Sequence, residues 1–299
     1  MSTIAQLCSD LKSAFDNRDV QHLSFLTSEY SSTSREKISR CYETTYKASI
    51  VDLLKKTFEE EDQATIKLLT SMWENRHELR ASLLSVSTPT RDTLIDTVML
   101  CSYEDWNAVT EVFNRQYGRI LQLDLKGVEP WEQLLLAWTK YQREPMEDGP
   151  EQASSKLHDT LHSTDGTTDH KKIVHFFSHV TPDEYPAIAT HYCHTYGASI
   201  DQDISRLYSD NDLEVFTAAH FALHGLPVLA AFILHRCCAK DGDSTRICHI
   251  TALMVDQCLA AKYAYRLYGD LGADLARTFP APLAGLLRTL WRVPPELSI

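Results

Sequence analysis

The sequence predicts an all-α fold built from repeated helical units. Apolar residues recur at helical spacing along most of the 299-residue chain. Only 10 Gly and 11 Pro are present, and they stand mostly at the ends of these periodic segments, as helix-breaking residues do. Hydrophobic residues make up 43% of the chain, which is enough for a sizeable core. An internal repeat then indicates how the helices are grouped.

A tyrosine-centred motif recurs with a period of about seventy residues. Self-comparison aligns the segments around the anchor tyrosines Tyr46, Tyr117, Tyr196 and Tyr268, and the step between the second and the third is the longest. A fixed period of this size is typical of one supersecondary unit stacked on copies of itself. We therefore expect four repeats of five helices each.

The apolar spacing places the five helices of the first repeat. They are expected at residues 4–15, 20–28, 34–46, 50–58 and 62–73. The third helix of the first three repeats also has a start signal, a hydroxyl residue followed three positions later by a carboxylate. These pairs are Thr33 with Glu36, Ser102 with Asp105, and Thr181 with Glu184, whereas the fourth repeat offers only Asp256.

The extra length between the second and third anchors lies in a segment rich in Pro, Gly, Ser and Glu. This segment has no helical periodicity, so it is interpreted as a linker. The predicted division is repeat one at residues 1–74, repeat two at 75–141, the linker at 142–155, repeat three at 156–223 and repeat four at 224–299.

Charge and composition exclude several classes of partner. The formal net charge is -12 and the pI is near 5.5, which disfavours nucleic acid because phosphate backbones need clustered Lys and Arg. Direct adsorption to an anionic membrane is disfavoured for the same reason, unless a divalent cation bridges the two surfaces. The N-terminal segment has no secretory signal pattern, and the longest apolar run, at residues 226–234, is too short to span a bilayer. We expect a cytoplasmic protein.

The motif around the first anchor resembles the annexin family. Arg35, Ile38, Tyr42 and Tyr46 form the pattern Arg-x-x-Ile-x-x-x-Tyr-x-x-x-Tyr, and the long connector separates repeats two and three, as it does in annexins. More narrowly, the segments at residues 28–38, 96–106, 220–225 and 287–293 are similar to the alpha-giardins. The resemblance covers essentially the whole chain. It implies a slightly curved disc that binds acidic phospholipids peripherally, in the presence of Ca2+.

In annexins the calcium loop is rich in glycine, and an acidic residue about forty positions later closes the site. Ca2+ prefers six to eight oxygen ligands, and glycine lets carbonyl groups converge on it. The resemblance places the third loop at residues 165–169 and the fourth at 240–245; the loops of repeats one and two contain no glycine. The metal ligands that it implies are Asp165, Gly166, Thr167, Asp210, Asp241, Gly242 and Asp243.

These calcium sites are expected to be weak, because their loops depart from the family pattern. Repeat four has no acid in its closing segment at residues 278–282. Acidic residues beside glycine are also common in ordinary turns, so a role as solvated turn residues is the alternative. The histidines at positions 170, 175, 179, 191 and 194 raise a zinc site as a further alternative, but there is no His-Glu-x-x-His motif.

Nothing in the sequence resembles a nucleophilic triad or a phosphate-binding glycine loop, so an enzyme is not expected. The first hypothesis is a Ca2+-dependent binder of acidic phospholipids, located at the cytoplasmic side of the plasma membrane. The alternative is a calcium-independent interaction protein of the cytoskeleton or flagella. Binding of sulfated glycans by an exposed form is a third, weaker interpretation.

Overall fold

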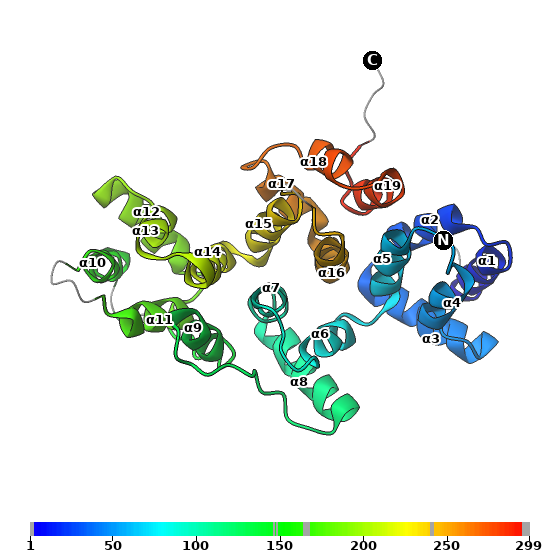
Figure 1. Ribbon diagram of the computed structural model, residues 1–299, viewed down its shortest axis with the longest axis horizontal. Helices are drawn as coiled ribbons and strands as arrows, with labels where there is room; N and C mark the ends of the chain where they lie inside the picture. Colours follow the sequence, from blue (N-terminus) through cyan, green and yellow to red (C-terminus); the bar gives the residue numbers. More distant parts are fainter. Residues whose placement is uncertain (1–2, 146, 148, 164–167, 240–241, 295–299) are drawn as a thin grey trace, which may run out of the picture. The chain divides into compact units, whose positions relative to one another are not determined.

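The computed structural model describes residues 3–145, 147, 149–163, 168–239 and 242–294. Within these ranges the regular structure is helical and no strand is found, so the predicted all-α class is confirmed (Figure 1). The chain divides into two compact units. The first contains residues 1–79 and 230–299, and the second contains residues 80–229. Each unit therefore combines most of two sequence repeats.

The first repeat contributes five helices to the first unit. They are α1 (Ile4–Asp16), α2 (Val20–Glu29), α3 (Ser32–Tyr46), α4 (Ile50–Thr57) and α5 (Gln63–Trp73). Their ends differ from the expected positions by no more than two residues. Each begins at a polar residue whose side chain accepts a backbone hydrogen bond from the first turn.

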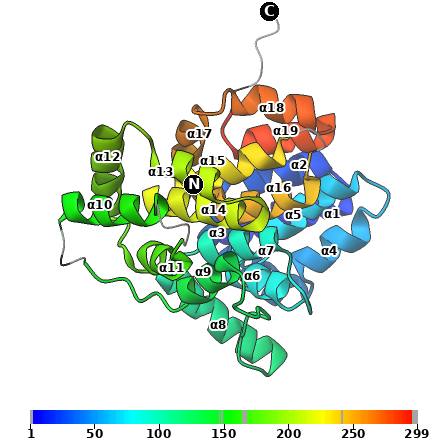
Figure 2. The ribbon, with the colours of Figure 1, turned by 60° about the vertical axis from the view of Figure 1, so that its left-hand side comes forward.

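The fourth repeat completes the first unit. Its elements are α15 (Leu226–Cys237), α16 (Ser244–Met254), η2 (Val255–Gln257), α17 (Cys258–Tyr265), α18 (Leu271–Thr278) and α19 (Ala281–Leu290). Helix α5 packs against α16, and the two lie side by side in Figures 1 and 2. Helix α19 also contacts α5 and α2. The apolar faces of both repeats thus share one core.

The same buried hydrogen bond occurs in both repeats of this unit. Trp73 Nε1 donates to Thr27 Oγ1 at 2.9 Å, and Trp291 Nε1 donates to Thr251 Oγ1 at 3.0 Å. The indoles are almost fully buried, so each N–H needs a partner inside the core. Each bond joins the second and the last helix of its repeat.

The second unit contains the other two repeats. Repeat two contributes α6 (Arg76–Leu84), α7 (Arg91–Leu94), η1 (Ile95–Met99), α8 (Tyr103–Tyr117) and α9 (Pro130–Trp138). Repeat three contributes α10 (Pro150–Leu161), α11 (His170–His179), α12 (Tyr185–Tyr196), α13 (Ile200–Leu207) and α14 (Asp210–His224). Helix α9 packs against α11 and α14, and α10 packs against α12.

Repeat two differs from the other three repeats in the segment between its α8 and α9. Between α8 and α9, residues 119–129 contain no helix. Leu121, Leu123 and Leu125 are partly buried, whereas the intervening Gln122 and Asp124 are exposed. This alternation has the period of an extended chain rather than of a helix, which explains why the fourth helix is missing.

The expected linker at 142–155 is also shorter than predicted. Helix α10 begins at Pro150, with Gly149 as its N-cap. Proline is favoured at the first helical position because its φ is preset and its missing N–H has no partner there anyway. The proline that was interpreted as a linker residue therefore starts a helix.

One of the expected start signals caps the third helix of its repeat, since Ser102 Oγ accepts from the backbone N–H of Asp105 at 3.1 Å. In repeat three Thr181 Oγ1 donates to the carboxylate of Glu184 at 2.6 Å, but α12 begins at Tyr185 with Glu184 as its N-cap, so Thr181 lies before the helix. In repeat one the prediction was wrong, because the N-cap is Ser31 rather than Thr33. The carboxylate of Asp256 accepts from the N–H of Ser32 at 3.0 Å, which stabilises a helix that starts earlier.

A buried carboxylate joins three helices of repeat three. Asp203 is 2% exposed and accepts from Tyr192 Oη at 2.6 Å and from Arg206 at 2.7 Å, and it pairs with His162 Nε2 at 3.0 Å. Burial alone raises the pKa of Asp203, but the hydrogen bonds from Tyr192 and His162 outweigh it, so the pKa lies below the usual value. Repeat four has a similar arrangement at Asp274, which accepts from Tyr265 and Arg277.

The loop before α16 packs tightly against the loop after α18. Gly242 has φ +59, and a Cβ at this position would lie 2.7 Å from Thr278 Cγ2. The Thr278 hydroxyl donates to the carbonyl of Cys238 at 3.3 Å, which fixes the orientation of the threonine. Both the backbone conformation and the lack of space therefore require glycine.

Replacing Asp203 should lower stability in a pH-dependent way. We expect Asp203→Asn to lower the free energy of unfolding by about 2 kcal/mol at pH 7, because hydrogen bonds to a buried charge are lost. A depressed folded-state pKa stabilises the fold above the unfolded value near 3.9, and this contribution disappears as the pH falls through the folded value. The difference between the variant and the wild type should therefore shrink below about pH 4.

Urea denaturation at several pH values measures this effect. Asp159→Asn is the control, because the side chain of Asp159 is 78% exposed. A difference between Asp203→Asn and wild type that stays constant down to pH 2 would contradict the assignment.

Gly242→Ala should destabilise the first unit by about 1–3 kcal/mol through strain and overlap with Thr278. The double variant Gly242→Ala with Thr278→Ser should recover part of this loss, since serine lacks the γ-methyl group but keeps the hydroxyl. Thermal and urea denaturation of the single and double variants provide the measurement. Equal instability of the two would show that the overlap contributes nothing.

Candidate calcium-binding loops

The third-repeat loop connects α10 to α11 and ends in a helix cap. Asp165, Gly166 and Thr167 lie outside the described residues, so their predicted role as ligands stays a prediction. At the end of the loop, the Asp169 carboxylate accepts from the N–H of Lys172 at 3.3 Å and starts α11. This hydrogen bond is the main cause of the lowered pKa of Asp169.

A hydrogen bond brings the closing segment of repeat three to this loop. His170 Nδ1 lies 3.0 Å from Tyr208 Oη, and the ring of Tyr208 stacks on Phe216 at a centroid distance of 4.4 Å. Tyr208 occupies the position where the resemblance places the closing acid. Burial raises the pKa of its phenol, so Tyr208 stays neutral and anchors the two segments to each other.

Two acids follow Tyr208, and they differ in their availability to a cation. Asp210 is exposed, and its Oδ2 accepts from the hydroxyl of Ser209 at 3.1 Å. Asp212 Oδ1 instead accepts from the N–H of Trp131 at 2.9 Å, at the start of α9, and burial raises the pKa of its carboxyl. Asp210 is thus the better placed of the two to bind a metal ion.

The fourth-repeat loop offers fewer available ligands. Asp241 lies outside the described residues, and Gly242 packs directly on Thr278. Asp243 caps α16, because its Oδ1 accepts from the N–H of Arg246 at 2.8 Å. In the closing segment of this repeat, Thr278 stands where calcium binding needs an acidic residue. Its hydroxyl already donates a hydrogen bond to the carbonyl of Cys238.

In the first two repeats, residues of the calcium-loop positions already form hydrogen bonds with other groups of the protein. In repeat one, Asp19 caps α2 and accepts from the N–H of His22 at 2.9 Å. In repeat two, the guanidinium of Arg119 donates to the carbonyl of Ser85 at 3.3 Å. A protein cation therefore contacts a carbonyl oxygen in the loop that a calcium ion would need.

The histidines form pairs rather than a metal cluster. The rings of His175 and His179 lie 3.9 Å apart, and His191 Nδ1 lies 2.6 Å from the hydroxyl of Ser154. In the part of the chain that the structure describes, no group of three or more His, Cys, Asp or Glu side chains is arranged to hold a metal. The same part of the chain contains no helix long and apolar enough to cross a bilayer.

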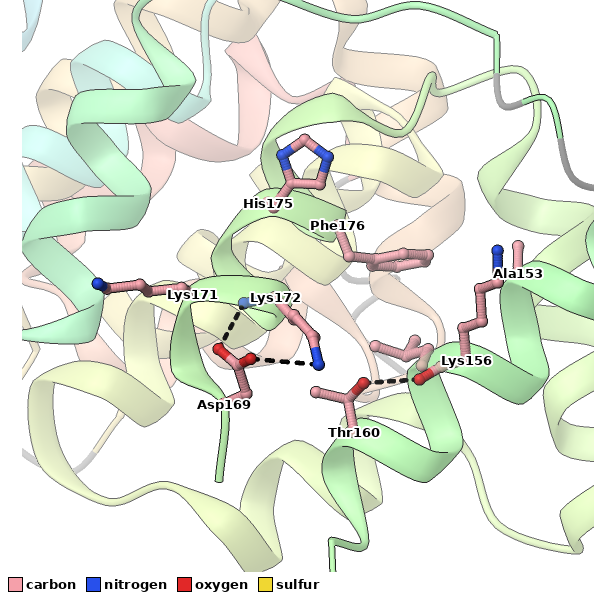
Figure 3. Close-up of a pocket in the computed structure, with 9 residues that line it drawn as sticks. Ala153, Lys156, Thr160, Asp169, Lys171, Lys172, His175 and Phe176 are labelled. Atoms are coloured by element: carbon pink, nitrogen blue, oxygen red, sulfur yellow. Dashed lines mark hydrogen bonds and ion pairs between the residues drawn. The ribbon is translucent and has the colours of Figure 1, made fainter. Parts of the chain in front are cut away.

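A cavity of about 490 Å³ lies beside the third loop, between α10 and α11 (Figure 3). Its lining residues come from both helices and include Lys156, Thr160, Lys172 and Phe176. Lys171 and Lys172 follow the predicted third loop in the sequence, whereas Lys156 and Thr160 share this space with them only because α10 packs against α11.

Comparisons with known proteins agree with this architecture. The family model of the fourth repeat of annexin E1 matches residues 230–292. Giardin subunit alpha-5 of Giardia intestinalis is 44% identical, over 98% of both chains. Giardin subunit alpha-1 of the same organism is 35% identical, over 98% of this chain and 100% of the relative.

Comparison with solved structures gives the same result. The crystal structure of calcium-bound alpha-1 giardin superimposes with a TM-score of 0.90 at 34% identity, covering 98% of this chain and 100% of that one. Annexin III has a TM-score of 0.81 at 14% identity, over 97% of this chain and 94% of its own, which shows the shared fold alone. Because relatives more than 30% identical align with nearly the whole chain, the protein belongs to the alpha-giardins, and it has the annexin fold.

Proposed function

We propose that this protein binds acidic phospholipid surfaces peripherally through Ca2+, and that repeat three provides the principal site. The observation that carries the proposal is the hydrogen bond between His170 and Tyr208. It holds the closing segment, with the exposed carboxylate of Asp210, beside the loop that contains the predicted ligands. The function is binding rather than catalysis.

The donor set suits a hard cation. Ca2+ prefers carboxylate and carbonyl oxygens and tolerates water in the remaining positions. Asp210 supplies a carboxylate whose hydrogen-bond partner is a neutral hydroxyl. The loop at residues 165–167 would supply the remaining protein oxygens. With so few carboxylates, we expect a dissociation constant of about 10⁻⁴ to 10⁻³ M.

The charge of the chain makes a bridging cation necessary. A protein with a formal net charge of -12 is repelled by an anionic membrane surface. A calcium ion held at the loop can accept a lipid phosphate oxygen as one of its ligands. Attachment should then depend on Ca2+ and reverse when the ion is removed. The proposed location is the cytoplasmic face of the plasma membrane.

Repeat four is the weaker part of the proposal. Asp241, Gly242 and Asp243 remain predicted ligands, but Asp243 already caps α16 and Thr278 stands in place of an acid. We therefore assign repeat four at most a secondary contribution to binding.

A second candidate function is a calcium-independent protein interaction, as in the cytoskeletal or flagellar hypothesis. Leu259, Tyr263 and Leu267 are 65%, 70% and 79% exposed, and their spacing places them along one side of α17 and the turn that follows it. Neighbouring exposed apolar side chains are typical of interaction surfaces. This surface belongs to the first unit, whereas the proposed calcium site belongs to the second.

The calcium hypothesis predicts a difference between two carboxylate variants. Asp210→Asn should raise the Ca2+ concentration for half-maximal binding to phosphatidylserine vesicles about tenfold, because one charged ligand is lost. Asp243→Asn should have a much smaller effect, since asparagine is an equally good helix cap. Co-sedimentation with vesicles from micromolar to millimolar Ca2+, with EGTA as the control, measures both.

Wild-type protein that fails to bind vesicles at any Ca2+ concentration would overturn the proposed function. If the wild type binds but Asp210→Asn matches it, the site is not the one in repeat three.

The interaction hypothesis predicts capture in the absence of calcium. Replacing both Leu259 and Tyr263 by serine should reduce capture of cytoskeletal proteins in EGTA by more than about fivefold, whereas Phe25→Ser, at an exposed aromatic of α2, should not. Quantitative pull-down from a cytoskeletal extract is the measurement. Equal capture by both variants would exclude the α17 surface.

A further inference from the structure

The cavity between α10 and α11 has a positively charged rim in an acidic protein. The described residues that line it include Lys156, Lys171 and Lys172 and the carboxylate of Asp169. The carboxylate is already engaged, because it caps α11 and pairs with Lys172 Nζ at 3.3 Å. The formal net charge of the whole chain is -12, so the local charge of this rim has the opposite sign to that of the chain. The rim therefore favours an anionic ligand.

The side of the cavity opposite the rim is apolar. Ala153, Leu157 and Phe176 line it and are between 2% and 8% exposed. In Figure 3 the ring of Phe176 extends from α11 toward the part of α10 that carries Ala153 and Lys156. The ring of Phe176 also packs against the ring of Tyr185, at a centroid distance of 6.3 Å. An apolar group can thus pack here while an attached anion stays at the rim.

The lysines do not all face the cavity. Figure 3 shows Lys172 reaching across the opening toward Thr160, and Lys156 rising from α10 on the other side. Lys171 extends in the opposite direction, away from Phe176. The hydroxyl of Thr160 donates to the carbonyl of Lys156 at 2.7 Å, which leaves its oxygen able to accept a further hydrogen bond. Lys156 and Lys172 are therefore the two cations placed to hold an anion.

The size of the cavity indicates what accompanies the anion. About 490 Å³ lies within the range of small-molecule sites and exceeds the volume of a bare phosphate or sulfate ion. Exposed ion pairs alone contribute little, and the side chain of Lys172 is 72% exposed. Appreciable affinity therefore requires an apolar group buried against Leu157 and Phe176 as well as the charge.

We propose that this cavity binds a phosphate monoester that carries a short apolar chain, with the phosphate between Lys156 and Lys172 and the chain against Leu157 and Phe176. The site needs no calcium, because its cations are lysines. It is thus separate in chemistry from the proposed calcium site, although both belong to repeat three. The ester can come from a free metabolite or from a lipid with a monoester headgroup.

The test is titration calorimetry of the full-length protein in EGTA with butyl, hexyl and octyl phosphate. Affinity should rise about threefold for each added methylene, as expected for burial of apolar surface. Inorganic phosphate and hexyltrimethylammonium should bind at least about thirtyfold more weakly than hexyl phosphate, because each lacks one of the two required parts.

Three glutamine variants locate the site. Lys156→Gln and Lys172→Gln should each weaken hexyl phosphate binding about fivefold, the upper range for an exposed ion pair. Lys171→Gln removes the same charge from the same turn of α11, but its side chain points away, so the loss should be under about twofold. All three substitutions lie at exposed positions, so the folded state should be unaffected.

Equal weakening by Lys171→Gln and Lys172→Gln would overturn the proposal, since it would show general electrostatic attraction. An affinity independent of chain length would overturn it as well. Vesicles containing phosphatidic acid, compared with pure phosphatidylcholine in EGTA, then identify the source. Binding to the former indicates a lipid headgroup, and binding only to the soluble esters indicates a free metabolite.

Discussion

The need to cap helices determines which acidic side chains remain available in this protein. The second helix of each repeat begins with an oxygen that accepts a backbone N–H, from Asp19, Thr90, Asp169 or Asp243. All four capping residues are solvent-exposed, and a side-chain cap still stabilises a helix by about 1 kcal/mol, so the fold favours a capping oxygen at these positions. Three carboxylates beside the candidate loops are thereby committed to structure. A cation must find its ligands among the residues that remain.

The same constraint distinguishes repeat three from repeat four. In both, a residue at or directly after the end of the fourth helix contacts the segment that leads into the second helix: Tyr208 contacts His170, and Thr278 contacts Cys238. In repeat three the contact is a hydrogen bond to a side chain, and an exposed acid follows it. In repeat four the hydroxyl of Thr278 donates to a loop carbonyl, and its methyl group fills the space beside Gly242. Two loops that both contain an Asp-Gly pair in the sequence therefore differ in the side chains that their closing segments offer to a cation.

Local patterns predicted the fold well, and long-range contacts explain what they missed. The helices of repeat one followed from apolar spacing alone, since each buries one face. The missing helix between α8 and α9 has a local signal as well, the alternation of leucines with polar residues at positions 121–125. At the site, Asp210 was expected as a ligand, but the commitment of Asp212 to Trp131 depends on packing between α9 and α14. No local pattern contains that information.

The two sites proposed for repeat three would each bind a phosphate group, and their chemistry makes them separable. A calcium ion at Asp210 would act as a removable bridge, with an affinity set by the Ca2+ concentration. Lys156 and Lys172 are permanent charges, and the apolar wall beside them selects for what the phosphate carries. Lys156 and Lys172 belong to α10 and α11, the helices that flank residues 162–169 in the sequence. Within a Debye length of about 8 Å, the lysines would also reduce the repulsion between an anionic ligand and the acidic chain. Their charge would then assist a calcium bridge without being part of it.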